Sequence, residues 1–456
     1  MRQVKLNWLT FLVGAVLFMF LLVGCNSSEG ETASGDDSGG ESGSETSSGS
    51  DDGGTSDEPV ELSILVSETA STPGFKKVLE GIERDLNIKT KVEVRPGGPE
   101  GENIVKTRLA TGEMSDLTLF NSGSLLMALN PEKYFVNLSN EPFMDRIMDS
   151  YKPVVTSNGK LFGIPARSSQ VGAWLYNKKI YKELNLEVPK TWDELMENNE
   201  KIKAAGKTAV IGTYGETWTS QLPILADYYN VQAEVPDFAD SYTEGEAKYS
   251  NTPQALRGFA RIQEIGERGF MNEDYTVATY DQGMKMLAEG TGAHYPMLTQ
   301  VLPLIAENFG DKVNDIGAFP QPSDDPSVNG HTVWMPDAIM INKETEKLEA
   351  AKKWLEYYIS EEGIAAYQEG DKSIGPFVIK GVDLPEDAYP AVKELVPYFE
   401  SGNVAPALEF VSPIKGPNLP QICTSVGSGQ MTAEEAAKMY DDDVKKQAKQ
   451  LGLNWD

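Results

Sequence analysis

The chain has 456 residues and a formal net charge of −29, because its 69 Asp and Glu residues outnumber its 40 Lys and Arg residues. Nucleic-acid binding depends on Lys and Arg side chains that neutralise phosphates, so we expect no nucleic-acid partner. The length exceeds what one hydrophobic core normally serves, which predicts two lobes.

Residues 1–25 have the layout of an export signal. Arg2 and Lys5 precede the apolar run LNWLTFLVGAVLFMFLLVG, which ends at Cys25. An apolar run of about 18 residues can also span a bilayer, so an uncleaved transmembrane helix is the alternative. Residues 22–25, LVGC, resemble a bacterial lipobox, in which the cysteine is lipidated. We therefore predict a lipoprotein signal peptide over residues 1–25, a palmitate-type anchor on Cys25, and a location at the extracellular face of the cell membrane.

Residues 26–58 consist almost entirely of Ser, Gly, Asp, Glu and Thr, with ten acidic and no basic or aromatic residues. Such a segment has too little apolar surface to offset its chain entropy, so we predict a disordered acidic linker. An acidic interaction tail is the alternative. Removing +2 for residues 1–25 and −10 for residues 26–58 from the total of −29 leaves −21 for residues 59–456.

The pattern after the linker alternates between strands and helices. Apolar residues at every second position predict a strand over residues 60–67, and helical spacing from Phe75 to Leu86 predicts a helix. A second strand around Val92 and Val94, a helix near residues 101–111 and a third strand from Asp116 follow. This alternation is typical of an α/β fold with a mainly parallel sheet.

Later segments carry clear helix signals. Thr191 with Glu194, and Thr432 with Glu435, have the spacing of capping boxes, and Gly206 is suited to a helix exit. An apolar stripe predicts a helical packing face over residues 345–360, and DIGAFPQP at residues 315–322 predicts a short strand that ends in a loop.

No catalytic constellation stands out. The two histidines, His294 and His331, lie outside any HExxH pattern, and the GKT at residues 206–208 leaves a helix where a phosphate loop would enter one. The calcium-loop-like residues 325–330 have Pro336 in place of the final Glu, and Asp441 to Asp443 are expected on a solvated helix face. Cys423 has no disulfide partner if Cys25 carries lipid. We expect no enzymatic activity, metal or cofactor, although 69 acidic residues leave a glycosidase pair formally open.

Five blocks in chain order point to one family. They are WLYNKKIYKELNLEVPKTWDEL at residues 174–195, YDQGMKMLAEGTGAHYPM at 280–297, and the segments 315–322, 338–358 and 429–452. These blocks resemble family 1 extracellular solute-binding proteins, the sugar-binding components of bacterial ABC importers. His294 departs from the family, which usually has a methionine there, and this puts the local cleft chemistry in doubt.

The resemblance implies a two-lobed, periplasmic-binding-protein-like α/β fold of the class II type with a ligand cleft between the lobes. We assign residues 60–168 and 292–336 to the first lobe, and residues 169–291 and 337–456 to the second.

A sugar site needs flat aromatic side chains for the C–H face of the ring and polar side chains for its hydroxyls. We select four aromatic candidates and five polar ones at strand ends and crossings: Trp218, Trp334, Trp174 and Tyr295, and Glu68, Asn121, Ser122, Arg167 and Asp337. Trp192 and Trp354 lie on predicted helices, where packing is the simpler interpretation.

The resemblance implies a monomer that captures a carbohydrate, an oligosaccharide by preference, through hinge closure. It would deliver the ligand to ABC permease subunits that are driven by a separate ATPase. Alternatives are a binding protein for a polyamine or another small solute, which the acidic chain would tolerate, and a secreted glycoside-active enzyme.

Overall fold

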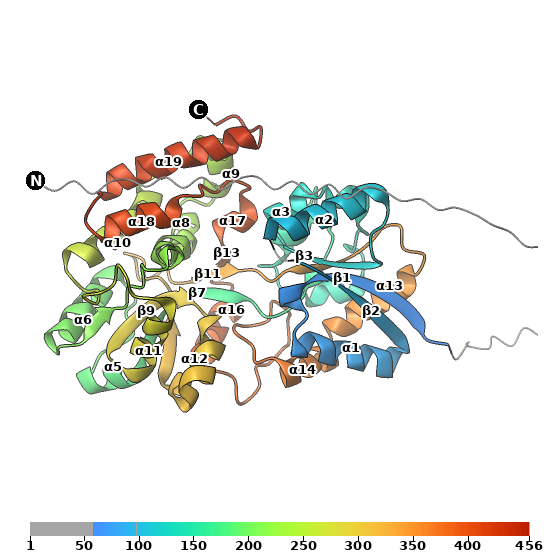
Figure 1. Ribbon diagram of the computed structural model, residues 1–456, viewed down its shortest axis with the longest axis horizontal. Coiled ribbons are helices and arrows are strands. Elements are labelled where there is room, and N and C mark those ends of the chain that lie inside the picture. Colours follow the sequence, from blue (N-terminus) through green and yellow to red (C-terminus); the bar gives the residue numbers. More distant parts are fainter. Residues whose placement is uncertain (1–57, 97, 456) are drawn as a thin grey trace, which may run out of the picture. The chain divides into compact units, whose positions relative to one another are not determined.

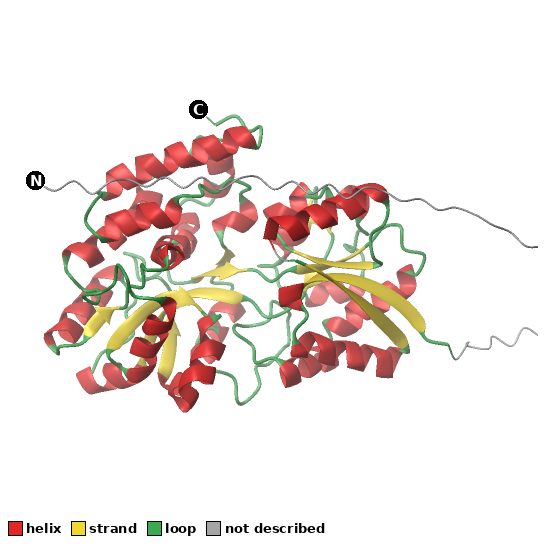
Figure 2. Ribbon diagram, in the orientation of Figure 1, coloured by secondary structure: helices red, strands yellow, loops and turns green. Residues whose placement is uncertain are grey.

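The computed structural model describes residues 58–96 and 98–455, which form two lobes built on separate β-sheets (Figures 1 and 2). The predicted signal peptide, Cys25 and all but the last residue of the predicted linker lie outside the described residues. Among the residues that are described, no helix is both long enough and apolar enough to cross a membrane.

The first lobe has a five-stranded sheet in the order β2-β1-β3-β12-β6. β1 pairs in parallel with β2 and β3, which confirms the predicted parallel α/β arrangement, and β12 pairs antiparallel with β3 and β6. The alternating apolar residues of β1 include Leu62, Ile64 and Val66, and all three are fully buried. The strands are β1 Val60–Ser67, β2 Ile88–Arg95, β3 Leu117–Phe120, β6 Ile164–Pro165 and β12 Ala338–Ile341.

Helices lie on both sides of this sheet, with α2 and α3 on one side and α1 and α14 on the other (Figure 1). The helices of the first lobe are α1 Pro73–Leu86, α2 Gly98–Thr111, α3 Ser124–Ala128, α4 Pro131–Tyr134, α13 Leu348–Tyr358 and α14 Glu361–Gly370. Shorter pieces complete it: the 3-10 turns η1 Glu68–Ala70, η2 Pro142–Arg146 and η3 Lys152–Val155, and the hairpin of β4 Thr156–Ser157 and β5 Lys160–Leu161.

The second lobe has a six-stranded sheet in the order β13-β11-β7-β9-β8, with β10 also paired to β7. Its strands are β7 Gln170–Asn177, β8 Thr208–Val210, β9 Gly292–Leu298, β10 Ile316–Phe319, β11 His331–Trp334 and β13 Val404–Pro406. Its larger helices are α5 Lys178–Leu184, α6 Trp192–Ala204, α8 Tyr228–Glu234, α10 Pro253–Glu267, α11 Tyr280–Glu289, α12 Val301–Phe309, α18 Leu419–Gly427 and α19 Ala433–Gln450. Its shorter pieces are α7 Leu222–Ala226, α9 Phe238–Thr243, α15 Pro390–Lys393, α16 Val396–Glu400, α17 Leu408–Val411, η4 Thr217–Gln221 and η5 Gly310–Asp315.

The predicted division of the chain between the lobes is wrong for two segments. Residues 292–336 supply β9, β10 and β11, which pair directly or through β7 with the second sheet, not the first. Residues 338–370 belong to the first lobe, because β12 pairs with β3 and the following helices pack on α1. The chain therefore returns to the first lobe after β11, between Trp334 and Ala338.

Three crossings connect the lobes, at residues 166–169, 335–337 and 371–389, and they are joined to one another by hydrogen bonds. The Ala166 N–H donates to the Asp337 carbonyl at 2.9 Å. The Ser169 hydroxyl donates to the Pro376 carbonyl at 2.7 Å. The crossings therefore form one connected hinge region.

The predicted helix starts are confirmed. Thr191 and Thr432 each form a complete capping box, and Gly206 has a φ of +75° just after α6. The expectation of a solvated face at Asp441 to Asp443 is wrong for two of the three residues. Asp441 accepts the backbone N–H groups of Tyr249 and Ser250, and Asp443 accepts that of Asn418, so both carboxylates are buried while Asp442 is exposed.

Cys423 of α18 is a free thiol that is fully buried in the second lobe. Burial raises the pKa of this thiol far above its ordinary value. The side chain therefore acts as a small apolar core residue.

Candidate ligand-binding site

The five predicted polar residues lie at one edge of the first sheet. Glu68 follows β1, Asn121 and Ser122 follow β3, and Arg167 comes two residues after β6. Asp337 precedes β12, which runs antiparallel to β3 and pairs Ala338 with Phe120, so it reaches the same edge. The carboxyl ends of parallel strands are where open α/β sheets bind ligands. The structure thus brings these residues together, and their contact with a ligand stays a prediction.

Arg167 and Asp337 form an ion pair between two of the crossings. Arg167 Nη2 lies 3.0 Å from Asp337 Oδ2, and both side chains are partly exposed. The Tyr151 hydroxyl, which is fully buried, lies 3.3 Å from the carbonyl oxygens of Pro336 and Asp337. The polar pair is therefore held in place before any ligand arrives.

The other polar residues differ in exposure. Glu68 and Asn121 are exposed, whereas Ser122 is only 3% exposed and its hydroxyl has no hydrogen-bond partner among the described residues. Sequence reasoning missed a neighbour, Arg95, at the end of β2. Its buried guanidinium lies 5.4 Å from the ring centroid of Phe120 and adds positive charge behind this edge.

Two of the predicted tryptophans lie at one edge of the second sheet. β11 runs antiparallel to β7 and ends at Trp334, while β8 is parallel to β9 and is followed by η4, which carries Trp218. The ends of β8, β9 and β11 therefore share the edge at which β7 begins. That edge faces the crossings, because Gln170 comes three residues after Arg167 and Trp334 three residues before Asp337. Three extended residues span at most about 11 Å, which limits the separation of the two edges at the hinge.

Trp218 forms a platform with a residue that sequence reasoning missed. The rings of Trp218 and Tyr280 lie 5.3 Å apart, and both side chains are partly exposed. Glu216 accepts the Trp218 indole N–H at 3.4 Å and the Tyr280 backbone N–H at 3.1 Å. The only sequence signal for Tyr280 was its place at a helix start, directly after the Thr279 cap.

Trp334 is bonded to a distant part of the chain. Its indole N–H donates to Glu409 of α17 at 2.6 Å, and Lys415 lies 2.6 Å from the other oxygen of Glu409. α17 also contacts α3 of the first lobe, and the two helices lie beside each other in Figure 1. Glu409 and Lys415 lie about 75 residues beyond Trp334 in sequence, so no local sequence pattern predicts this arrangement.

The prediction of ligand contact is wrong for Trp174 and Tyr295, which are core residues. Each is 1% exposed. They lie in the middle of β7 and β9, where Trp174 pairs with Pro296 and Leu175 with Tyr295. Residues on both faces of these strands are buried. The Trp174 indole N–H donates to Gln321 at 2.5 Å, and the Tyr295 hydroxyl lies 3.0 Å from Thr213 Oγ1.

His294 is also a core residue, so its departure from the family pattern does not reach the site. Its ring nitrogens lie 2.7 Å from the Tyr181 hydroxyl and 2.9 Å from Asn199 Oδ1. Burial lowers the pKa of His294 to about 3 and that of His331 to about 4. Both imidazoles are neutral and enclosed at neutral pH, so neither is placed to act as a base on a bound ligand.

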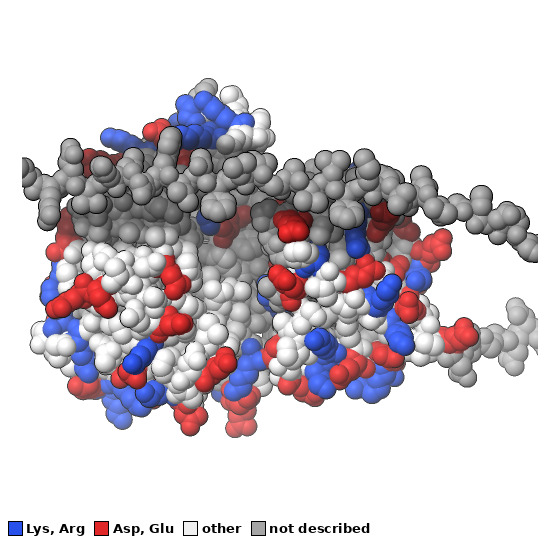
Figure 3. All heavy atoms as spheres, viewed as in Figure 1, with Lys and Arg blue, Asp and Glu red and all other residues white. Residues whose placement is uncertain are grey.

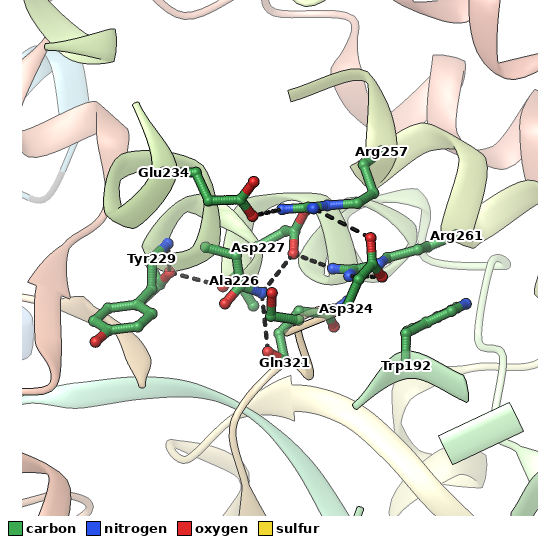
Figure 4. Close-up of polar contacts among 12 residues, drawn as sticks. Trp192, Ala226, Asp227, Tyr229, Glu234, Arg257, Arg261, Gln321 and Asp324 are labelled. Atoms are coloured by element: carbon green, nitrogen blue, oxygen red, sulfur yellow. Dashed lines mark hydrogen bonds and ion pairs between the residues drawn. The ribbon is translucent and has the colours of Figure 1, made fainter. Parts of the chain in front are cut away.

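The second lobe also holds an ionic network around the buried Arg261 and Asp227, shown in Figure 4. Arg261 of α10 is paired with the buried carboxylate of Asp227, lies 3.0 Å from Asp324, and stacks on Trp192 at 4.9 Å. Asn230 donates to Asp227 at 2.8 Å and to the Gln321 carbonyl at 3.0 Å. The network ties α8 and α10 to the loop after β10, and Trp192 has the packing role predicted for it.

Surface charges of both signs are interspersed on the face shown in Figure 3. Within the described chain, no group of three His, Cys, Asp or Glu side chains is arranged to hold a metal ion.

Residues 67–365 match the model of the bacterial extracellular solute-binding protein family. The chain belongs to this family. The "Multiple sugar-binding protein" of Streptococcus mutans is 25% identical over 312 residues, which cover 68% of this chain and 72% of that protein.

Solved structures of solute-binding proteins share the fold. The apo form of RafE from Streptococcus pneumoniae superposes with a TM-score of 0.72 at 20% identity, covering 88% of this chain and 100% of that chain. RafE in complex with raffinose gives a TM-score of 0.63 at 21% identity, covering 86% of this chain and 99% of that chain. The predicted two-lobed fold is confirmed.

Proposed function

We propose that this solute-binding protein captures a neutral carbohydrate, preferably an oligosaccharide, between the two sheet edges and delivers it to an ABC permease. The observation that carries the proposal is the placement of aromatic side chains, Trp218 with Tyr280 and Trp334, at the edge of the second sheet near the crossings, with a polar set at the corresponding edge of the first sheet. Sugar rings combine an apolar C–H face with a rim of hydroxyls. The aromatic side chains suit the C–H face, and the polar side chains suit the hydroxyls.

The relatives support this ligand class. The S. mutans relative is named for sugar binding, and one structural neighbour holds raffinose. Ligand that touches both edges would favour the closed arrangement of the lobes, because only that arrangement makes both sets of contacts. The proposed protein is a monomer that binds without chemical turnover.

The charges at the site favour a neutral ligand over a polyamine. A polycation would need carboxylates that converge and lack partners. Asp337 is paired with Arg167, Glu409 with Lys415, and Glu216 accepts two N–H groups. These carboxylates are spread over both edges and are already neutralised or bonded, which supports hydroxyl recognition.

Isothermal titration of residues 57–456, which form a compact unit, tests the ligand class. Probes are raffinose, maltose, xylobiose and, as the opposing class, spermidine. We expect at least one saccharide to bind without being cleaved and spermidine not to bind. Binding of spermidine alone would overturn the proposal, and release of sugar fragments would point to an enzyme.

Trp218→Ala should raise the Kd of the bound saccharide about tenfold, because stacking is worth roughly 0.5–1.5 kcal/mol beyond the loss of buried area. Trp218→Phe keeps an aromatic face and should lie between the alanine variant and the parent. Unchanged affinity in Trp218→Ala, with the fold intact by circular dichroism, would remove Trp218 from the site.

We propose further that Cys25 carries the lipid that holds the protein at the outer face of the membrane. Cys25→Ser should leave the precursor unlipidated and release the protein from the membrane fraction. A cleaved and normally anchored Cys25→Ser protein would contradict this.

A further inference from the structure

Trp334 is held at two opposite ends of its ring system by residues of the second lobe. At the polar end, its Nε1–H donates to Glu409 Oε1 at 2.6 Å, while Lys415 Nζ lies 2.6 Å from Glu409 Oε2. At the apolar end, a Cβ atom added to Gly172 of β7 would lie 2.8 Å from Cζ3 of the indole. The six-membered ring therefore packs directly on the β7 backbone, and the indole has little freedom to turn.

This clamp lies where the two lobes meet. Phe410, the residue after Glu409, contacts the first lobe: a Cβ atom added to Gly123 would lie 2.6 Å from the Phe410 carbonyl oxygen. Gly123 directly follows the candidate polar residues Asn121 and Ser122 at the first edge. Glu409 is thus placed between the aromatic edge of one lobe and the polar edge of the other.

We propose that Glu409 is a positioning residue, which turns the Trp334 indole so that a ring face, and not the N–H group, is presented to the ligand. Gly172 assists by leaving room for the ring. The proposal rests on the proposed function and deepens it. Since the Trp334 N–H is already donated to a carboxylate, it is not free to bind a ligand hydroxyl.

The same arrangement is found at Trp218, and it gives the two lobes different roles in binding. The Trp218 N–H also points to a carboxylate of its own lobe, that of Glu216 at 3.4 Å. The second lobe therefore offers ring faces, and hydroxyl recognition falls to the first edge. The expected ligand is a saccharide in which one sugar ring has a continuous C–H face that can pack on Trp334. The site should tolerate changes in those hydroxyls of this ring that point away from Trp334.

The test compares Glu409→Ala, Glu409→Gln and Gly172→Ala with the parent protein. Gln321→Ala is the matched control, because Gln321 bonds an indole N–H of the same lobe, that of Trp174, which is buried away from the site. Three quantities are measured: the Kd for raffinose or for whichever saccharide of the panel binds, the melting temperature, and acrylamide quenching of Trp334. The Trp334 signal is the difference between each protein and its Trp334→Phe counterpart, without ligand.

We expect Glu409→Ala to raise the Kd about tenfold, as loss of a hydrogen bond to a charged group would, and to increase Trp334 quenching. Glu409→Gln keeps an acceptor for the indole N–H and should restore both quantities to within about threefold of the parent. Gly172→Ala should raise the Kd by displacing the ring. Gln321→Ala should lower the melting temperature and leave the Kd unchanged.

Two outcomes overturn the proposal: unchanged Trp334 quenching in Glu409→Ala, or a Glu409→Gln protein that behaves like Glu409→Ala. Failure of the proposed function is a separate result. If the parent binds no saccharide, the proposed function is lost, while the ligand-free quenching still decides whether Glu409 orients Trp334.

Discussion

His331 makes the stability of this protein sensitive to acid. Burial holds its folded pKa at about 4, against about 6.5 in an unfolded chain. Well above pH 6.5 the imidazole is neutral in both states and contributes no pH dependence. At lower pH the unfolded state binds a proton at His331 that the native state does not, so this residue alone lowers the free energy of unfolding by up to about 1.4 kcal/mol per pH unit until the pH approaches the folded pKa.

His331→Phe removes this titration, so its unfolding free energy should fall less steeply than that of the parent between pH 6 and pH 5. The slopes of unfolding free energy against pH should differ by the equivalent of about one bound proton. Urea unfolding at several pH values measures it. Equal slopes would mean that the imidazole reaches solvent in the native state, contrary to its complete burial.

The positions of single residues at the candidate site were predictable where their place relative to a strand was predictable. Trp334 ends a strand and Trp218 follows one, and such positions point toward a sheet edge. Trp174 and Tyr295 lie mid-strand, where elements packed on the faces of the sheet bury them: Trp174 packs on Trp192 of α6, and Tyr295 packs on Gly283 of α11. Sequence spacing does not show which faces are covered in this way. Glu409 and Arg95 were missed because their roles depend on partners far away in the chain.

At the scale of elements, packing of α19 buries some of its consecutive aspartates and leaves another exposed. Asp441 accepts two backbone N–H groups, each at 2.9 Å, from the turn that precedes α10, whereas Asp442 is exposed on the same helix. Asp441→Ala should lower the free energy of unfolding by about 2–3 kcal/mol, since buried donors lose a charged acceptor. Asp442→Ala, the matched control, should change it by less than about 0.5 kcal/mol. Guanidinium unfolding compares them, and equal effects would contradict the assignment.

Most elements were predictable because hydrophobic period and capping residues are local signals. The Thr191 and Thr432 caps and the first three strands were found in this way. The assignment of β9 to β12 to the lobes was not, because strand pairing depends on contacts between segments far apart in the chain, such as the pairing of Ala338 with Phe120. β12 sits between β3 and β6, and nothing in AIMI itself selects those partners.

For the whole molecule, the hinge depends on close contact between crossings. A Cβ atom added to Gly375 would lie 2.3 Å from the Ser169 carbonyl oxygen, so Gly375→Ala must separate the first and third crossings. We expect a loss of about 1–3 kcal/mol in stability together with weaker saccharide binding, because the closure that we propose requires the crossings to stay in register.

Gly159→Ala is the control for Gly375→Ala. Gly159 has a φ of +72° in the β4–β5 hairpin and open space around it, so its substitution should cost stability without changing the Kd. Calorimetry and small-angle scattering with and without ligand separate the two effects. Equal saccharide affinities in the two variants would mean that the hinge lies elsewhere in the chain.

The burial of Cys423 has a practical consequence for testing the proposed closure. Its thiol, carried by α18, is enclosed in the core of the second lobe and is protonated at ordinary pH. It should therefore not react with maleimide reagents while the protein is folded. Within residues 57–456 it is the sole cysteine. A cysteine introduced at an exposed position beside the first edge would therefore be the single site of dye attachment, and the labelled protein could report saccharide capture as a fluorescence change without removal of Cys423.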